Sequence, residues 1–178
     1  MTRYYAVMIK VIQRLFQVCL FKASPADIPA SSILVNFSIV SYFVVGVLVS
    51  HIDHNWTISL VASLADSLML IITTKILLSI RGLPYRFEQT VTAMAGTGAL
   101  IGMISWPVFL LFRQVEPHSQ ITSIILLLVL IVIFWSLFVV AHIFRYALDI
   151  RPGLAAVITT VYTIATLIVV GLTISGVA

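Results

Sequence analysis

The sequence predicts an all-α membrane protein, a polytopic bundle of five transmembrane helices preceded by an amphipathic helix at the membrane interface. Its composition is one reason, because 61% of the 178 residues are apolar and 9% are charged, whereas about a quarter of a soluble domain is charged. A mean hydropathy of +1.17 agrees with this. Uncharged stretches are the other reason, with 25 residues after Asp27, 24 after Glu88, 28 after Glu116 and 27 from Pro152 onward. Each exceeds the roughly 20 residues that a helix needs to cross a bilayer.

Residues 1–23 are predicted to form a basic amphipathic helix that lies flat on the inner membrane surface. At 100° per residue, Arg3, Lys10 and Arg14 fall within an arc of about 40°, and apolar side chains occupy the opposite half. Because each basic group near anionic headgroups contributes about 1 kcal/mol, the expected partner of this face is the lipid bilayer with its anionic lipids. The alternative is that the helix packs on the cytoplasmic ends of the bundle.

Residues 24–178 are predicted to form the transmembrane domain. Pro25 and Pro29 break the chain after the surface helix, and the serines that follow can cap the first span. The segment that begins at Trp56 is the least secure span, because it contains Asp66 and Lys75. The expected spans cover residues 32–51, 56–80, 89–112, 121–142 and 154–176.

The distribution of basic residues predicts the orientation of the chain. Five crossings place the termini on opposite sides, and with a cytoplasmic N-terminus nine of the ten Lys and Arg residues lie at the inner face, while Arg113 lies outside. This split follows the positive-inside rule. The sequence therefore predicts a multi-pass protein of the bacterial inner membrane whose C-terminus is periplasmic or external.

Asp66 is the most informative single residue, since it lies near the middle of the second span. An ionised carboxylate at that depth costs about 2.5 to 3.5 kcal/mol, so it should face the bundle interior, be protonated or find a partner. Lys75 is excluded as that partner, because nine residues of helix place it about 13 Å away on the opposite face. Neighbours on other helices are expected to be among Asn36, Tyr42, Thr159, Tyr162, Thr163 and Thr166.

Two interpretations of Asp66 remain open. The structural one is an interhelical hydrogen bond. The functional one is a proton or cation relay, with a polar site formed by Asp66, Ser63, Ser59 and Thr163.

Four small residues share one face of the third span, at Ala95, Gly98, Gly102 and Ser105. The spacing of Gly98 and Gly102 lets two helix backbones approach closely. We interpret this face as a packing surface for a neighbouring helix of the same chain, with dimerisation as the alternative.

The ends of the spans carry two further polar groups. His142, Arg145, Tyr146 and Asp149 share one face if the fourth span continues, with an ion pair between Arg145 and Asp149. We interpret them as a solvated helix end, with a binding pocket as the alternative. On the outer side, imidazoles and carboxylates that could bind a metal are weak candidates only, because they lack a known ligand spacing. These are His51, Asp53, His54, Glu116 and His118.

Signatures of other functions are missing from the sequence. It contains no phosphate-binding glycine loop and no nucleophile elbow, and its single cysteine excludes an internal disulfide. We therefore expect neither enzymatic activity nor a cofactor, and the composition excludes a nucleic-acid-binding module.

The chain resembles the YIP (Ypt/Rab-interacting protein) superfamily, in particular its small bacterial inner-membrane members. The resemblance rests on five closely spaced spans, on residues 21–29 before the first span, and on the segment 86–90, which leads into residues 95–98 and then Trp106 and Pro107. It implies an integral membrane protein, without enzymatic activity, that shapes or scaffolds a membrane or binds partners there. It supplies no functional residue.

Two functions are compatible with these features. The first is a scaffold or interaction partner in a bacterial cytoplasmic membrane, working as a homo-oligomer or with another membrane protein. The alternative is translocation of protons or small ions through a polar path around Asp66, in an oligomer, because five short helices enclose little volume.

Overall fold

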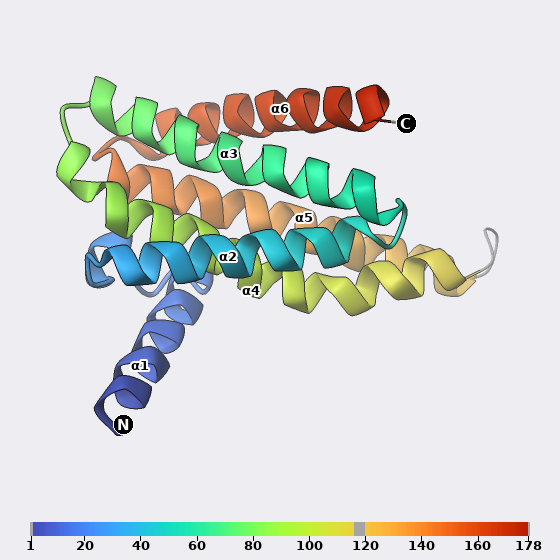
Figure 1. The fold of residues 1–178 in the computed structure, drawn as a ribbon, viewed down its shortest axis with the longest axis horizontal. Helices are drawn as coiled ribbons and strands as arrows, with labels where there is room; N and C mark the ends of the chain where they lie inside the picture. The colour runs from blue at the N-terminus through green and yellow to red at the C-terminus, as the bar shows by residue number, and fades with distance from the viewer. Residues whose placement is uncertain (1, 116–119, 178) are drawn as a thin grey trace.

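The structure is a computed structural model that describes the backbone of residues 2–115 and 120–177 and the side chains of residues 9–115 and 121–176. In these residues it contains α-helices and short 3₁₀ turns and no strand (Figure 1). The helices are α1 (Thr2–Cys19), α2 (Ser32–Ser50), α3 (Trp56–Ile80), α4 (Phe87–Gln114), α5 (Gln120–Ala147) and α6 (Pro152–Val177).

Among the described residues, helices α2 to α6 are the five that are long and apolar enough to cross a membrane. The predicted all-α bundle is therefore confirmed, and the protein is a multi-pass membrane protein. Most predicted span limits agree with the helices to within two residues. Helix α5 is the exception, because it continues to Ala147 where the prediction ends at residue 142.

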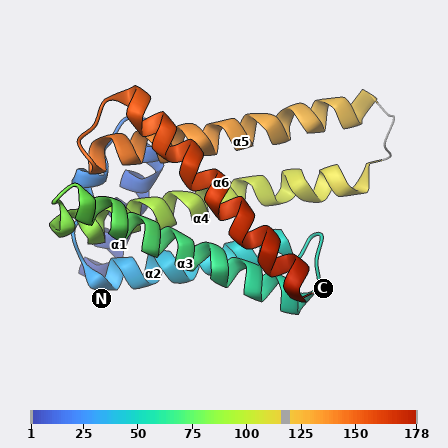
Figure 2. The same ribbon diagram turned by 90° about the horizontal axis from the view of Figure 1, so that it is seen from above.

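Helices α2 to α5 lie along roughly the same axis and alternate in direction (Figure 1), while α6 crosses them diagonally (Figure 2). Helix α4 is central and packs against α2, α3 and α5. We call the end that carries Arg81, Arg86 and Arg151 the basic end. The end that carries Asp53 and Arg113 is called the Asp53 end.

Three helices end in the same type of turn. Phe21, Gly82 and Asp149 have left-handed φ angles of 60°, 69° and 52°. In each turn the next residue donates its backbone N–H to a carbonyl five residues earlier, which is the hydrogen bond of a Schellman motif. Glycine suits this position, whereas a side chain with a Cβ atom costs about 1–2 kcal/mol there.

The turn at Asp149 corrects one sequence-based expectation. Because α5 ends at Ala147, Asp149 does not continue its face. Among the described residues, the ion pair that forms is the one between Arg113 and Asp53, and not one between Arg145 and Asp149. Arg145 instead lies over the ring of Tyr146, with 5.2 Å between the guanidinium carbon and the ring centroid.

Helix α1 projects from the flank of the bundle near the basic end (Figure 1). Its apolar half is divided between two environments. Val11, Leu15, Val18 and Cys19 are buried against the bundle, and Trp135 of α5 donates its indole N–H to the carbonyl oxygen of Cys19 at 2.9 Å. The exposed part of the helix carries Ile9, Ile12, Phe16, Lys10 and Arg14. Arg3 belongs to the part of α1 whose side chains lie outside the described residues.

Candidate functional site

Asp66 lies half-buried in the middle of α3 and is bonded to α2. Its Oδ2 atom accepts a hydrogen bond from the hydroxyl of Tyr42, at 2.6 Å. Tyr42 is one of the neighbours that the sequence suggests, so the interhelical hydrogen bond is confirmed. Lys75 is exposed, as expected of a side chain that reaches toward the membrane surface rather than toward Asp66.

Gly98 is what allows Tyr42 to reach Asp66. A Cβ atom at Gly98 would lie 2.5 Å from Cε2 of Tyr42, and one at Gly102 would lie 2.6 Å from Cγ1 of Val45. The small face of α4 therefore packs directly on α2 of the same chain, as predicted. Ala95 and Ser105, which complete this face, are buried as well. Because α2 covers the two glycines, they are not available to a second copy.

A cavity of about 310 Å³ lies next to Asp66, and its lining includes residues from all five long helices. Tyr42 is the lining residue from α2, and Asp66 is the acidic lining residue from α3. The hydroxyl residues of the lining from the other three helices are Thr97, Ser105, Ser136, Tyr162, Thr163 and Thr166. Of the predicted polar site, Asp66 and Thr163 are thus brought together.

Ser59 and Ser63 do not belong to this lining. Ser59 donates its hydroxyl to the carbonyl of Asn55 at 2.9 Å. Ser63 faces α2, where its Oγ atom would lie 3.2 Å from a Cβ atom at Gly46. The stripe of serines on α3 is therefore part of the α2–α3 contact, and only its Asp66 end reaches the cavity.

Three of the six hydroxyl residues that α4, α5 and α6 place in the cavity lining are better suited to cations than to anions. Thr97, Ser105 and Ser136 each donate their hydroxyl hydrogen to a carbonyl of their own helix, at 2.7, 3.0 and 2.7 Å. A hydroxyl whose hydrogen is engaged in this way keeps acceptor lone pairs. Together with the carboxylate of Asp66, these oxygens form a set that favours protons or hard cations.

The cavity has a closed side toward the basic end. Its lining on α4 runs from Met94 to Phe109, which corresponds to about 22 Å of helix in the direction of the Asp53 end. Toward the basic end, the interior is filled by apolar side chains that are at most 1% exposed. These are Leu78, Val91, Ile143 and Phe144.

Thr97 and Ser136 line the cavity although neither is among the residues that were expected near Asp66. Ser136 has a usable signal, because it is the only hydroxyl residue between Ser123 and Tyr146 in an otherwise apolar helix. The sequence contains no such signal for Thr97, because it is one of several small residues on α4. The direction of its side chain depends on how the helix is rotated.

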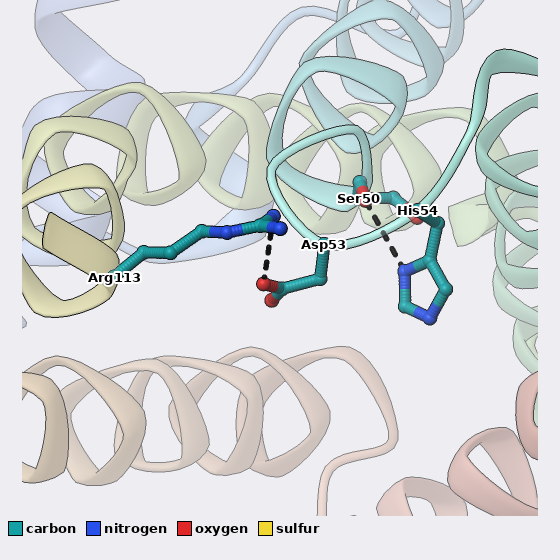
Figure 3. Close-up of polar contacts among 4 residues, drawn as sticks. All are labelled: Ser50, Asp53, His54 and Arg113. Atoms are coloured by element: carbon teal, nitrogen blue, oxygen red, sulfur yellow. Dashed lines mark hydrogen bonds and ion pairs between the residues drawn. The ribbon is translucent and has the colours of Figure 1, made fainter.

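The loop between α2 and α3 forms contacts other than metal coordination. Asp53 pairs with Arg113 at 3.1 Å, and His54 turns away from this pair toward the carbonyl of Ser50 (Figure 3). His51 stacks on Trp56, with 3.8 Å between ring centroids. Within the part of the chain that the structure describes, no three His, Cys, Asp or Glu residues are placed to hold a metal ion. Glu116 and His118 lie outside the described residues.

Comparison with protein-family models, with curated proteins and with solved structures finds no match to the chain. The choice between functions consequently depends on the geometry of the chain itself.

Proposed function

We propose that this membrane protein, acting without enzymatic chemistry, translocates protons or a small cation through the cavity around Asp66. The observation that carries this proposal is the oxygen set of the cavity. A carboxylate and three hydroxyls whose hydrogens are already engaged face a space of about 310 Å³ between the five spans. Ionisable groups are costly inside a bilayer and therefore tend to mark ion or proton paths.

The proposal includes an orientation and a location. With the basic end in the cytoplasm of a bacterial cell, Arg81, Arg86 and Arg151 lie on the inner side, as the positive-inside rule requires. The cavity then extends toward the external face and is closed toward the cytoplasm by the apolar layer around Phe144. Passage requires this layer to open.

The test is a flux measurement on the reconstituted protein. Proteoliposomes that contain a pH-sensitive dye are given a potassium diffusion potential, and proton entry is recorded; sodium and potassium entry are measured with ion-selective dyes. Wild-type protein is expected to conduct above empty liposomes, and Asp66→Asn is expected to abolish this flux. Asp53→Asn is the matched control, because it removes a carboxylate from the exposed outer loop.

Two results would refute the proposal. One is a wild-type flux that equals that of empty liposomes for all three ions. The other is an Asp66→Asn protein that keeps the full flux and the wild-type unfolding temperature in detergent.

A scaffold or interaction protein is the second candidate, and the exposed side of α1 favours it. Ile9, Ile12 and Phe16 are each about half exposed beside Lys10 and Arg14, which leaves an apolar and basic surface for lipid or for another membrane protein. The resemblance to the YIP superfamily implies the same role. A photo-crosslinker at Ile12, compared with one at the exposed Ile164 of α6, should capture a partner or a second copy in native membranes if this candidate is right.

A further inference from the structure

A second hollow lies on the outside of the bundle, between α5, the start of α6 and the turn at Phe21. It has a volume of about 930 Å³. Its wall on α5 runs from Leu127 to Arg145, which is about 27 Å of helix. One leaflet of a bilayer with its headgroups measures roughly 20–22 Å. The groove is therefore long enough for one lipid molecule, from headgroup to the end of its acyl chains.

The two ends of the groove differ in chemistry. Most of the length is apolar, with Ile131, Phe134 and Phe138 among the lining residues. At the basic end the lining changes to His142 and Arg145. Arg145 is exposed and is held over the ring of Tyr146, so its charge stays next to the groove. An apolar channel with a cation at the headgroup level is complementary to an anionic lipid.

The turn at Phe21 indicates that the groove is a binding site and not an incidental surface depression. Phe21 occupies a left-handed position, with φ at 60°, where a bulky residue is an outlier. Its ring packs edge-on against His142 at 5.4 Å between centroids, and His142 donates its Nε2 hydrogen to the carbonyl of Ala23 at 2.9 Å. Strained residues that the surrounding structure holds in place are concentrated at ligand sites. Here the ring of Phe21 forms one wall of the groove.

We propose that this groove is a binding site for one anionic phospholipid, with the phosphate at Arg145 and an acyl chain along the apolar face of α5. Basic pockets between transmembrane helices at the cytoplasmic side are a known form of lipid site. The site is independent of the cavity at Asp66, so either proposal can fail without the other.

The test uses Trp135, which lines the groove. In a Trp56→Phe, Trp106→Phe background it is the only tryptophan left of three. The protein is reconstituted in phosphatidylcholine vesicles that contain equal fractions of brominated phosphatidylglycerol or brominated phosphatidylcholine, and quenching gives the relative association constant. We expect the anionic lipid to bind about fivefold better, which corresponds to roughly 1 kcal/mol for one basic group.

The Arg145→Gln variant should reduce this ratio to about one, since a single cation sets the preference. Lys75→Gln is the matched control, because Lys75 is an exposed cation near the same end on a different helix, and it should leave the ratio unchanged. Equal quenching by both lipids in the unsubstituted protein would overturn the proposal. A preference for the anionic lipid that survives Arg145→Gln would overturn the proposal as well. The same holds if neither lipid quenches Trp135 and copies of the protein are found crosslinked across the groove.

Phe21→Gly is a second variant, which relieves the backbone strain of the left-handed turn and removes one wall of the groove. Glycine fits the left-handed turn, so the unfolding temperature should not fall, while quenching by the anionic lipid should weaken. Burial raises the pKa of the Cys19 thiol to about 11, which makes it a poor nucleophile at neutral pH. Slow maleimide labelling of Cys19 therefore verifies that α1 is still docked. Unchanged anionic-lipid quenching in a docked Phe21→Gly protein would contradict the role of this turn.

Discussion

The two ends of the bundle are held together in different ways. At the basic end, Arg81 donates to the carbonyls of Leu148 and Asp149 at 3.2 and 3.3 Å. Arg86 donates to the carbonyls of Tyr146 and Ala147 at 3.2 and 3.3 Å. The connection between α3 and α4 thus satisfies carbonyls that the end of α5 leaves without helical partners. At the Asp53 end, the described ion pair between Arg113 and Asp53 is more than half exposed.

The linker between α1 and α2 strengthens the basic end further. Gln89 of α4 donates to the carbonyl of Ile28 at 3.0 Å, and Ser32 donates to Glu88 at 2.7 Å. At the other end, α4 and α5 extend beyond α2, α3 and α6 in both views (Figures 1 and 2). The difference indicates that the basic end resists separation of its helices more strongly than the Asp53 end does.

The largest expected effect concerns the close contact that links the two ends along α2 and α4. Gly98→Ala should lower the free energy of unfolding by about 2–3 kcal/mol, because the added methyl group displaces Tyr42 and overpacks the contact. Gly171→Ala is the matched control on α6, where a Cβ atom meets nothing within 4 Å, and it should be neutral or slightly stabilising. Unfolding in mixed detergent micelles measures both. Equal destabilisation by the two substitutions would show that the α2–α4 contact is not special.

The next effect compares the two ends directly. Replacement of both Arg81 and Arg86 by lysine preserves the charge but loses the planar group that reaches two carbonyls at once. The expected loss is about 1–2 kcal/mol. Arg113→Lys should change the free energy of unfolding by less than about 0.5 kcal/mol, since its ion pair is exposed.

Hydrogen exchange adds a local measurement to the same pair of variants. The double lysine variant should exchange faster in the last turn of α5, and Arg113→Lys should leave that turn unchanged. If Arg113→Lys proves as costly as the double variant, the Asp53 end is as firmly held as the basic end and the proposed difference between the two ends is wrong.

The sequence was sufficient for the spans but not for their contacts. Runs of uncharged residues identify α2, α4, α5 and α6, because the length of a spanning helix is set by the bilayer. The distribution of Lys and Arg residues supports α3, which contains Asp66 and Lys75. These sequence features also make Tyr42 a candidate partner of Asp66. They do not show that α5 stops at Ala147, since the left-handed turn at Asp149 depends on carbonyls that Arg81 and Arg86 satisfy from another helix.

The cavity lining was predicted only in part, because Tyr42, Tyr162, Thr163 and Thr166 were expected near Asp66 whereas Thr97 and Ser136 were not. The sides of α3 and α4 that face inward are decided by the rotation of each helix against its neighbours, which Gly98 and Gly102 determine through contact with α2. This rotation directs Thr97 into the cavity and leaves Ser59 and Ser63 outside it. The docking of α1 on the bundle was one of two alternatives that the sequence left open, because its apolar face is compatible both with lipid and with protein.

The smallest effect is a pH dependence of the linker at the basic end. The backbone N–H of Ser24 donates to Oδ2 of Asp27 at 2.7 Å and its hydroxyl donates at 3.1 Å. The first of these bonds is the main cause that lowers the pKa of the Asp27 carboxyl below its usual value. A carboxyl whose pKa is lower in the folded state stabilises the fold above its unfolded pKa of about 3.9, and this contribution is lost as the pH falls through the folded pKa.

Because Asp27 is exposed, water screens the interaction and the contribution should stay below about 0.5 kcal/mol. The measurement is the free energy of unfolding at pH 6 and at pH 3 for wild type and for Asp27→Asn, whose amide cannot titrate. The loss between the two pH values should be smaller in Asp27→Asn by that amount. A difference well above about 0.5 kcal/mol would mean that the linker turn contributes more to the stability of the basic end than its exposure allows. Identical pH dependence in the two proteins would mean that the turn does not contribute to this stability.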